Sequence, residues 1–306
     1  MSTRVGCKSS SQPWFATQFT CTILEINCYR QGISDSAHEI DIALRRVNPD
    51  GLNSLIISHC PALSIPPRIQ ELPYLDALEI NNASLLKWGE DAKVTHSTMP
   101  ALQMLAFVRV NMTALPDAIL TSDLSHRLRD LTISESNLTT LPPDLAIKWR
   151  RLFDLFIERT RVEVIAPTLA ISSPMRLSLM GNQIHELPDD LFVHSQFSVL
   201  SVAKNPITKW PETIGNLDYL TMLLLDYTEI EELPSWLLDE GQHRGKTGKI
   251  ITVSAGGSAY CRAKSALPSF SAVDESNTGL RVECRVKPEE EYEAYPLSYN
   301  TRHRPV

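Results

Sequence analysis

The residues of this sequence that could do chemistry do not assemble into a complete catalytic motif. The run Gly241-Gln242-His243-Arg244-Gly245-Lys246-Thr247 is close to a phosphate-binding loop, but three residues separate its glycines where the motif has four. It also follows a segment predicted to be helical, residues 235–240, whereas a phosphate-binding loop follows a strand. We interpret the run as a polar connection between two structured parts of the chain.

The other candidates for catalysis or metal binding are also incomplete. His38-Glu39 lacks the second histidine that a zinc-binding helix carries three residues after the glutamate. No Gly-x-Ser-x-Gly nucleophile elbow occurs. Cys261 and Cys284 lack the Cys-x-x-Cys spacing of a zinc knuckle. The sequence therefore predicts a protein that is not an enzyme, with no cofactor and no metal site.

Composition narrows the class of protein further. The chain has 306 residues, enough for one large domain or two ordinary ones, and 43% of them are hydrophobic. A net charge of -7 argues against a general nucleic-acid or anionic-membrane binder. No apolar run approaches the roughly 20 residues of a membrane helix, and residues 1–20 lack the apolar core of a secretory signal. Proline (20) outnumbers glycine (12), which points to repeated placement of proline.

An internal repeat accounts for the prolines. Apolar residues recur two, seven and ten positions after an initial leucine, as in Leu131, Ile133, Leu138 and Leu141, and a proline often follows directly. The alternation of the first two residues is typical of a short strand with one buried side. The units are 22 to 31 residues apart and begin at Leu24, Leu55, Leu78, Leu105, Leu131, Leu155, Leu177, Leu200 and Leu223.

The pattern resembles the leucine-rich-repeat family, whose consensus is L-x-x-L-x-L-x-x-N-x-L-x-x-L-P. The ends of several units, such as Leu187-Pro188-Asp189-Asp190-Leu191, are similar to the L-P-x-x-I/L variety. The resemblance covers roughly residues 20–240. It implies an α/β fold, a right-handed solenoid or horseshoe with a concave parallel β-sheet, in which neighbouring units bury each other's leucines.

The column that holds asparagine in the family is irregular here. It reads Cys60, Ala83, Val110, Ser136, Thr160, Asn182, Asn205 and Thr228. Alanine and valine side chains form no hydrogen bond, and a buried backbone group left unpaired costs about 1–3 kcal/mol. We therefore expect the first half of the repeats to be less regular than the second. We also expect Cys60 to be a buried free thiol.

The repeats suggest a division of the chain into four parts. We predict an N-terminal cap with a degenerate first repeat over residues 1–51 and repeats over residues 52–240. A C-terminal cap would follow over residues 241–284, with its strand at residues 249–254. Residues 285–306 contain few apolar side chains and are predicted to be a disordered tail.

The resemblance also implies cysteine pairs in both caps. It suggests a Cys261–Cys284 bridge and one bridge among Cys7, Cys21 and Cys28, whose pairing stays open. Three Asn-x-Ser/Thr sequons predict N-glycosylation at Asn82, Asn111 and Asn137. Both features favour an extracellular or membrane-tethered segment of a longer protein. Six reduced thiols in a cytosolic protein are the alternative.

The resemblance places the functional surface on the concave face. Aromatic and charged residues at exposed strand positions are typical of recognition surfaces. A glycan at Asn82 would exclude a partner from the first strands, so we expect Phe156, Arg159 and Tyr227 to be central. The predicted ligand-binding residues are Arg109, Glu135, Phe156, Glu158, Arg159, Lys204, Leu224, Asp226 and Tyr227.

These observations lead to one functional expectation and one alternative. We expect a non-catalytic protein-recognition module that binds a protein ligand, not nucleic acid, and that has no membrane span. The alternative is a cytosolic signalling scaffold similar to the Ras-group leucine-rich-repeat proteins. The oligomeric state stays open.

Overall fold

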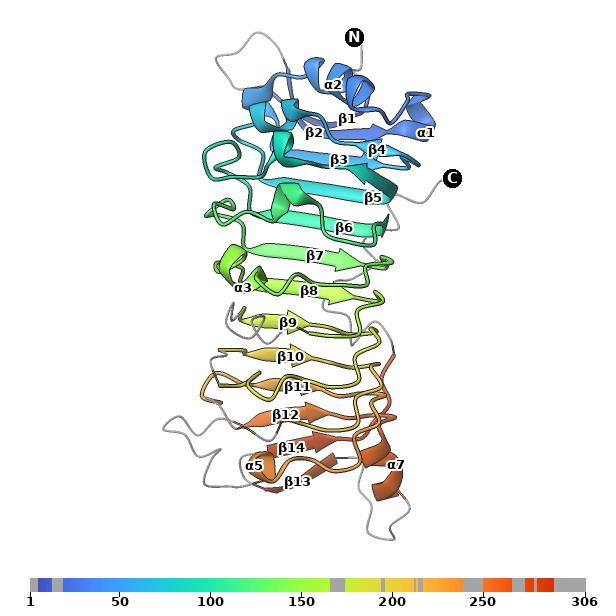
Figure 1. Cartoon of the computed structure of the whole chain (residues 1–306), viewed down its shortest axis with the longest axis vertical. Helices are drawn as coiled ribbons and strands as arrows, with labels where there is room; N and C mark the ends of the chain where they lie inside the picture. The colour runs from blue at the N-terminus through green and yellow to red at the C-terminus, as the bar shows by residue number, and fades with distance from the viewer. Residues whose placement is uncertain are drawn as a thin grey trace. The chain divides into compact units, whose positions relative to one another are not determined.

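The computed structural model contains two compact units built on parallel strands (Figure 1). It describes residues 5–12, 19–165, 174–193, 196–211, 213, 217–238, 250–265, 273–277 and 280–288. The described residues of unit 1 lie within Met1–Leu138 and those of unit 2 within Thr139–Arg304. The glycine-rich run 241–247 and most of the predicted tail, residues 289–306, lie outside the described residues.

Unit 1 is a sheet in which the initial leucines of successive repeats are register partners. Leu55 pairs with Leu24 on one side and with Leu78 on the other, and Leu105 pairs with Leu131. The strands lie in the order β1-β2-β3-β5-β6-β7, with β1 antiparallel and β4 paired only with β5. Their bounds are β1 Cys7–Ser11, β2 Thr20–Asn27, β3 Ser54–Ser58, β4 Leu63–Ser64, β5 Ala77–Lys87, β6 Met104–Asn111 and β7 Asp130–Ser134.

Short helices connect these strands. The longest helix of unit 1, α2, begins where the hydroxyl of Ser36 accepts a hydrogen bond from the backbone N–H of Glu39, a typical N-cap. Proline precedes two of the 3₁₀ turns, η2 and η4, at the point where the repeat pattern places a proline after its last apolar residue. The helices are α1 Cys28–Gln31, α2 Ala37–Arg45, η1 Pro49–Gly51, η2 Pro67–Glu71, η3 Glu90–Ala92 and η4 Asp117–Ile119.

Unit 2 repeats the arrangement with shorter strands. Leu177 pairs with Leu155 and Leu200, and Leu223 pairs with Val253 of the predicted C-terminal strand. The strand order is β8-β9-β10-β11-β12-β14-β13, and only β13 is antiparallel. The elements are α3 Leu145–Lys148, β8 Asp154–Glu158, β9 Arg176–Ser178, β10 Val199–Ser201, β11 Met222–Leu224, α5 Ser235–Leu238, β12 Ile251–Ser254, α7 Ala259–Ser265, β13 Val273–Asn277 and β14 Leu280–Glu283.

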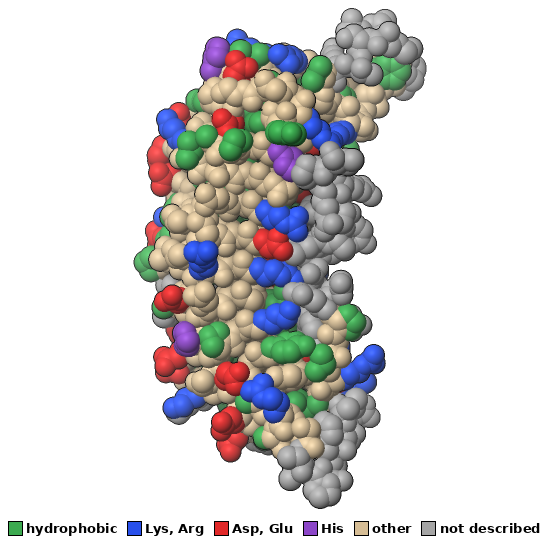
Figure 2. Space-filling model, turned by 90° about the vertical axis from the view of Figure 1, so that its right-hand side faces the viewer, with side chains coloured by type: hydrophobic (Ala, Val, Ile, Leu, Met, Phe, Trp, Pro, Cys, Tyr) green, Lys and Arg blue, Asp and Glu red, His purple; other side chains and the backbone are tan. Residues whose placement is uncertain are grey.

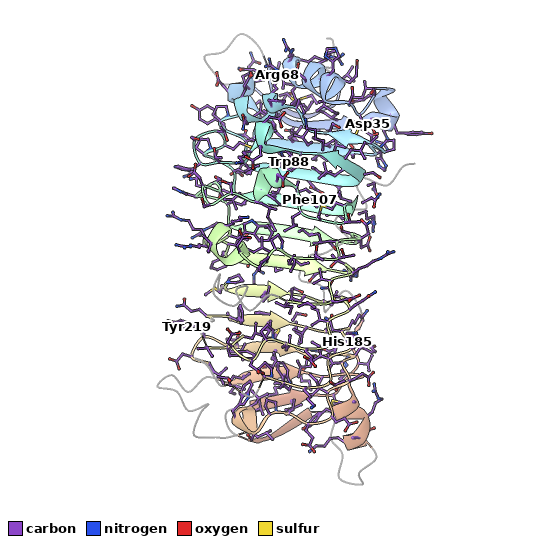
Figure 3. The ribbon with its side chains drawn as sticks, in the orientation of Figure 1. Asp35, Arg68, Trp88, Phe107, His185 and Tyr219 are labelled. Carbon is purple, nitrogen blue, oxygen red and sulfur yellow. A yellow bond between two sulfur atoms is a disulfide. The ribbon has the colours of Figure 1, made fainter. Side chains whose placement is uncertain are left out.

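The core of each unit lies on the side of the sheet that carries the initial leucines. Leu55, Leu105, Leu155 and Leu200 are completely buried. In each repeat, the strand is followed by a segment that leads back to the start of the next strand, which we call the return arm. Aromatic side chains fill the space between the sheet and the return arms. Trp88 and Phe107 are an example, with ring centroids 6.0 Å apart (Figure 3). The predicted parallel, leucine-rich sheet is confirmed, and the core forms because neighbouring repeats cover each other's leucines.

The first half of the repeats is less regular than the second, as expected: β3, β5, β6 and β7 have 5, 11, 8 and 5 residues, whereas β9, β10 and β11 have 3 each. Where the column holds Ala83 and Val110, β5 and β6 continue, and these two residues become register partners. The longer strands supply the backbone hydrogen bonds that an asparagine would otherwise make. In unit 2 the asparagines have the role expected from the family: the Asn182 amide nitrogen donates to the carbonyls of Ile157 and Leu179, each at 2.7 Å.

Three disulfides tie the ends of the sheets. Cys261 and Cys284 are bridged, as the resemblance implied, and Cys7 is bridged to Cys21. The prediction of a free thiol at Cys60 is wrong, because Cys60 is buried and bridged to Cys28. The register that pairs Asn27 with Ser58 brings the following turns together and places the two Cα atoms 5.1 Å apart.

Candidate functional site

A row of left-handed residues runs across the repeats of each unit, inside β5 and β6 and after the shorter strands. Among the described residues, seven that are not glycine have φ between 46° and 58°, and each stands four positions after the initial leucine of its repeat. Glycine occupies the same position at Gly181 and Gly257. The left-handed row of unit 1 is His59, Asn82, Arg109 and Glu135, and that of unit 2 is Arg159, Gly181, Lys204, Tyr227 and Gly257.

A repeated hydrogen bond explains this conformation. At five positions of the rows, the left-handed turn directs the backbone N–H to the carbonyl of the residue three positions after the first residue of the next repeat; the five are His59, Arg159, Gly181, Lys204 and Tyr227. The N–H of Arg159 donates to Met180 at 2.8 Å, and that of Lys204 donates to Asp226 at 2.7 Å. A non-glycine residue in this region costs about 1 kcal/mol or more. The hydrogen bond offsets part of this cost at the repeats that form it.

The left-handed rows display charged and aromatic side chains at partly exposed positions. Basic and acidic side chains lie close together on the surface shown in Figure 2. Arg109 and Glu135 form an ion pair in unit 1. In unit 2 the Lys204 ammonium lies 5.7 Å from the centroid of the Tyr227 ring, within range of a cation–π interaction. Tyr227 is the most exposed of the predicted site residues, at 41%.

Gly257 allows the Tyr227 ring to lie where it does. A Cβ atom at position 257 would be 2.7 Å from two atoms of that ring, closer than carbon atoms approach each other. The φ of Gly257 is also positive, at 72°. The glycine therefore meets both a steric and a conformational requirement.

Four of the predicted ligand-binding residues are not exposed as the sequence suggested. Phe156, Glu158, Leu224 and Asp226 are only 6%, 0%, 8% and 0% exposed. They belong to the surface formed by residues one and three positions after each initial leucine, which we call the outer face. Because side chains alternate along a strand, these four residues do point away from the leucine core, as predicted. The prediction that they are exposed to solvent is wrong. The five remaining predicted residues, Arg109, Glu135, Arg159, Lys204 and Tyr227, all lie in the left-handed rows.

The outer face of unit 2 contains a buried carboxyl group at Asp226. Its Oδ1 accepts hydrogen bonds from the Ser254 hydroxyl at 3.0 Å and from the Gly256 N–H at 2.7 Å, whereas Oδ2 has no hydrogen-bond partner among the residues that the structure describes. Burial raises the pKa of Asp226 to about 6; the two hydrogen bonds and the charge of Lys287 lower it and limit the rise. The charged form of Asp226 is therefore disfavoured in the folded chain.

Asp226 should make stability fall as the pH rises. Above pH 3.8 the carboxyl ionises first in the unfolded chain, so the free energy of unfolding decreases until the folded pKa of about 6 is passed. The shift corresponds to about 3 kcal/mol at neutral pH. Asp226→Asn keeps an oxygen acceptor, so it should raise stability at pH 7 by about 1–3 kcal/mol and flatten the profile between pH 4 and 6. Denaturant unfolding across this pH range measures both effects.

The exposed Asp189 provides a matched control for that experiment. Asp189→Asn should change the free energy of unfolding by less than about 0.5 kcal/mol at every pH. If Asp226→Asn destabilises the chain equally at pH 4 and pH 7, the ionised carboxylate contributes a favourable contact and our account of Asp226 is wrong.

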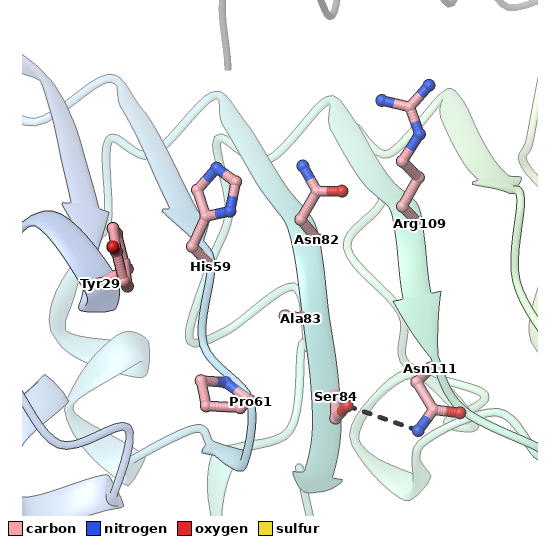
Figure 4. A pocket seen from close by; sticks show the side chains of 8 residues that line it. All are labelled: Tyr29, His59, Pro61, Asn82, Ala83, Ser84, Arg109 and Asn111. Carbon is pink, nitrogen blue, oxygen red and sulfur yellow. Dashed lines mark hydrogen bonds between the residues drawn. The ribbon is translucent and has the colours of Figure 1, made fainter. Parts of the chain in front are cut away.

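A cavity of about 710 Å³ lies over the C-terminal halves of β5 and β6 and the turn after β3 in unit 1 (Figure 4). His59, Asn82 and Arg109 come from consecutive strands and point the same way into it, and α1 contributes Tyr29. Asn111 also lines the cavity and donates from its amide nitrogen to the Ser84 hydroxyl at 3.4 Å. Two predicted glycosylation sites, Asn82 and Asn111, therefore share one cavity. The third, Asn137, accepts a hydrogen bond from the Met112 N–H at 2.7 Å.

A second cavity, of about 930 Å³, lies between two return arms of unit 2. Trp210 and Trp236 line it, and their ring centroids are 6.5 Å apart. Glu229, Glu231 and Glu232 lie at its exposed rim. The sequence contained a signal for this site that we did not use: Trp210 replaces the leucine of the Leu-Pro pair in its repeat.

Within the described ranges, no group of three or more histidine, cysteine, aspartate or glutamate residues is placed to hold a metal ion. No helix in the described part of the chain is long and apolar enough to span a membrane. The described surface carries two rows of charged and aromatic side chains and the two cavities described above.

No protein-family model and no curated protein matches the sequence. Among solved structures, a leucine-rich-repeat protein of Leptospira interrogans is 17% identical, with 78% of this chain and 67% of that chain covered and a TM-score of 0.44. The internalin InlF of Listeria monocytogenes is 17% identical, with 74% and 65% covered and a TM-score of 0.48. A plant ice-binding protein is 21% identical, with 67% and 57% covered and a TM-score of 0.43.

The chain spans 57% to 67% of the length of these three structures. Because each TM-score is below 0.5, the fold is assigned from the register of the strands and the spacing of the repeats. The strand register and the repeat spacing both describe a leucine-rich-repeat-like sheet in each unit.

Proposed function

We propose that the chain is a non-catalytic recognition module that binds a protein ligand through the left-handed row of unit 2. The observation that carries this proposal is the presence of Arg159, Lys204 and Tyr227 in a conformation that glycine adopts at lower cost. Strained backbone tends to occur where a side chain is needed for function. Arginine and tyrosine are also the residue types that most often dominate the energy of protein interfaces.

The row of unit 2 fits a partner that is partly acidic. Arg159 and Lys204 bring two positive charges, and the Tyr227 ring beside Lys204 adds a flat, partly apolar surface. Such a combination suits a loop that carries carboxylates and apolar side chains. The buried residues Phe156, Glu158, Leu224 and Asp226 contribute by supporting the row from the outer face.

Glycine substitutions test this proposal without harming the fold. In the triple variant Arg159→Gly, Lys204→Gly, Tyr227→Gly, the backbone keeps its left-handed conformation at lower cost, so stability should be unchanged or higher. If each side chain contributes about 2 kcal/mol, partner binding should weaken far more than tenfold. The partner is first captured from the native source with the full chain, and dissociation constants are then measured for both forms.

His59→Gly is the matched control, because His59 has the same conformation in the row of unit 1. It should leave the dissociation constant unchanged within a factor of about two. Loss of binding in this control, together with full binding in the triple variant, would place the binding surface elsewhere.

We further propose an extracellular or membrane-tethered location for this module. The three disulfides support it, because such bridges persist in oxidising compartments. Glycans at Asn82 and Asn111 would occupy the cavity of unit 1 and leave the row of unit 2 accessible. The cytosolic scaffold is the alternative, and a count of free thiols in native protein separates the two.

A further inference from the structure

The outer face of unit 2 is buried although it points away from the leucine core. Glu158, Met180 and Asp226 are each 0% exposed, and Met180 packs with Ala203 and Leu224 in an apolar cluster. Neighbouring strands flank a side chain on a sheet face but leave its tip in water. Complete burial of three long side chains within four successive repeats therefore requires a layer that lies over them.

The chain itself enters this face after its last strand. Gly256 stands at the outer-face position of its repeat, and a Cβ atom there would collide with the carbonyl oxygen of Arg285 and lie 3.0 Å from the Val286 nitrogen. Lys287 follows; its ammonium lies 3.0 Å from Glu283, and its charge acts on Asp226. Residues 285–287 therefore run along the outer face from β12 toward β11.

The part of the chain beyond this point has the charge and length to continue across the face. Residues 289–306 begin with Glu289, Glu290, Glu291, Tyr292 and Glu293, so four of the first five are acidic. The unit 2 surface ahead of them carries Lys204 and Arg159, whereas the nearby Arg176 is paired with Asp154. Strands lie about 4.8 Å apart, so β11 to β8 spans about 14 Å, which five extended residues at about 3.3 Å each cover.

We propose that the start of the C-terminal segment, residues 289–293, binds the outer face of unit 2, with its acidic side chains against Arg159 and Lys204. Tyr292 would then lie near the apolar cluster of Met180, Ala203 and Leu224. The segment is an internal ligand, and a protein partner that binds the same side chains must displace it. This inference goes beyond the proposed function, since it names an occupant within the chain and needs no partner for its test.

Oxidation of Met180 by dilute hydrogen peroxide reports whether the face is covered. In the full chain, Met180 should react at least tenfold more slowly than Met175, which is 40% exposed. Reversing the charges with Glu289→Lys, Glu290→Lys, Glu291→Lys and Glu293→Lys should release the segment and bring the Met180 rate within about threefold of the Met175 rate. Mass spectrometry of peptides gives each rate.

Two controls accompany the charge reversal. The buried Met99 of unit 1 should stay protected, which shows that the variant is folded. Arg302→Glu with Arg304→Glu changes the far end of the segment and should leave Met180 protected. Met180 that reacts rapidly in the wild-type chain, or that stays protected after charge reversal, would overturn the proposal. Protection that disappears on dilution would also overturn it, because a second copy of the chain would then be the cover.

Discussion

Replacing Leu200 with alanine should lower the free energy of unfolding of unit 2 by about 2–5 kcal/mol. Leu200 is completely buried and pairs in register with Leu177 and Leu223. Shortening it leaves a cavity between two repeats, and the strands on either side are held too firmly by their hydrogen bonds to close it. Leu177→Ala should have a similar effect. Hydrogen exchange or denaturant unfolding followed in unit 2 measures the loss.

The same substitution at an exposed leucine serves as the control. Leu86 is 70% exposed, so Leu86→Ala should cost less than about 0.5 kcal/mol. A loss below this value at both Leu177 and Leu200 would contradict the assignment of these leucines to the core. In a repeat protein the destabilisation should also be strongest in the strands next to the mutation, because each repeat contacts only its neighbours.

Removing the Cys28–Cys60 bridge should destabilise unit 1 by about 3–4 kcal/mol. The bridge closes a loop with a sequence separation of 32, and opening it gives the unfolded chain more conformations. The variant Cys28→Ala with Cys60→Ala avoids leaving a buried thiol unpaired, and thermal or denaturant unfolding of unit 1 measures the effect. The Cys7–Cys21 bridge, with a separation of 14, should contribute slightly less when removed in the same way.

Thiol counting tests the pairing itself. All six cysteines are bridged, so native protein should react with no equivalents of a thiol reagent and with six after denaturation and reduction. Six reactive thiols in protein taken from its native compartment would contradict the pairing. They would also favour the cytosolic alternative.

The repeat pattern was sufficient to predict which side chains enter the core. Leu55, Leu105, Leu155 and Leu200 are buried as expected, because alternation along a strand and a repeating offset are local properties of the chain. The sequence also contained the spacing of the left-handed rows, because Arg159, Lys204 and Tyr227 each stand four residues after an initial leucine. Their residue types did not indicate a positive φ.

Where the strands end could not be read from the same pattern. β5 continues to Ser84 beside β6 and on to Lys87 beside β4, so the length of one strand depends on neighbours that are 22 to 27 residues away in sequence. The partner of Cys60 depended in the same way on the register between β2 and β3. Hydrogen bonds and disulfides between repeats join residues that no local pattern relates.

The accessibility of the outer face depended most on contacts distant in sequence. The alternation of side chains along a strand correctly predicted that Phe156, Glu158, Leu224 and Asp226 point away from the leucine core. Their residue types suggested a recognition surface. Whether such a face meets water is a matter of what packs over it, and the chain begins to cross that face at Arg285, more than 50 residues after Asp226. Periodicity gives a side chain its direction, whereas burial depends on the tertiary neighbours it meets there.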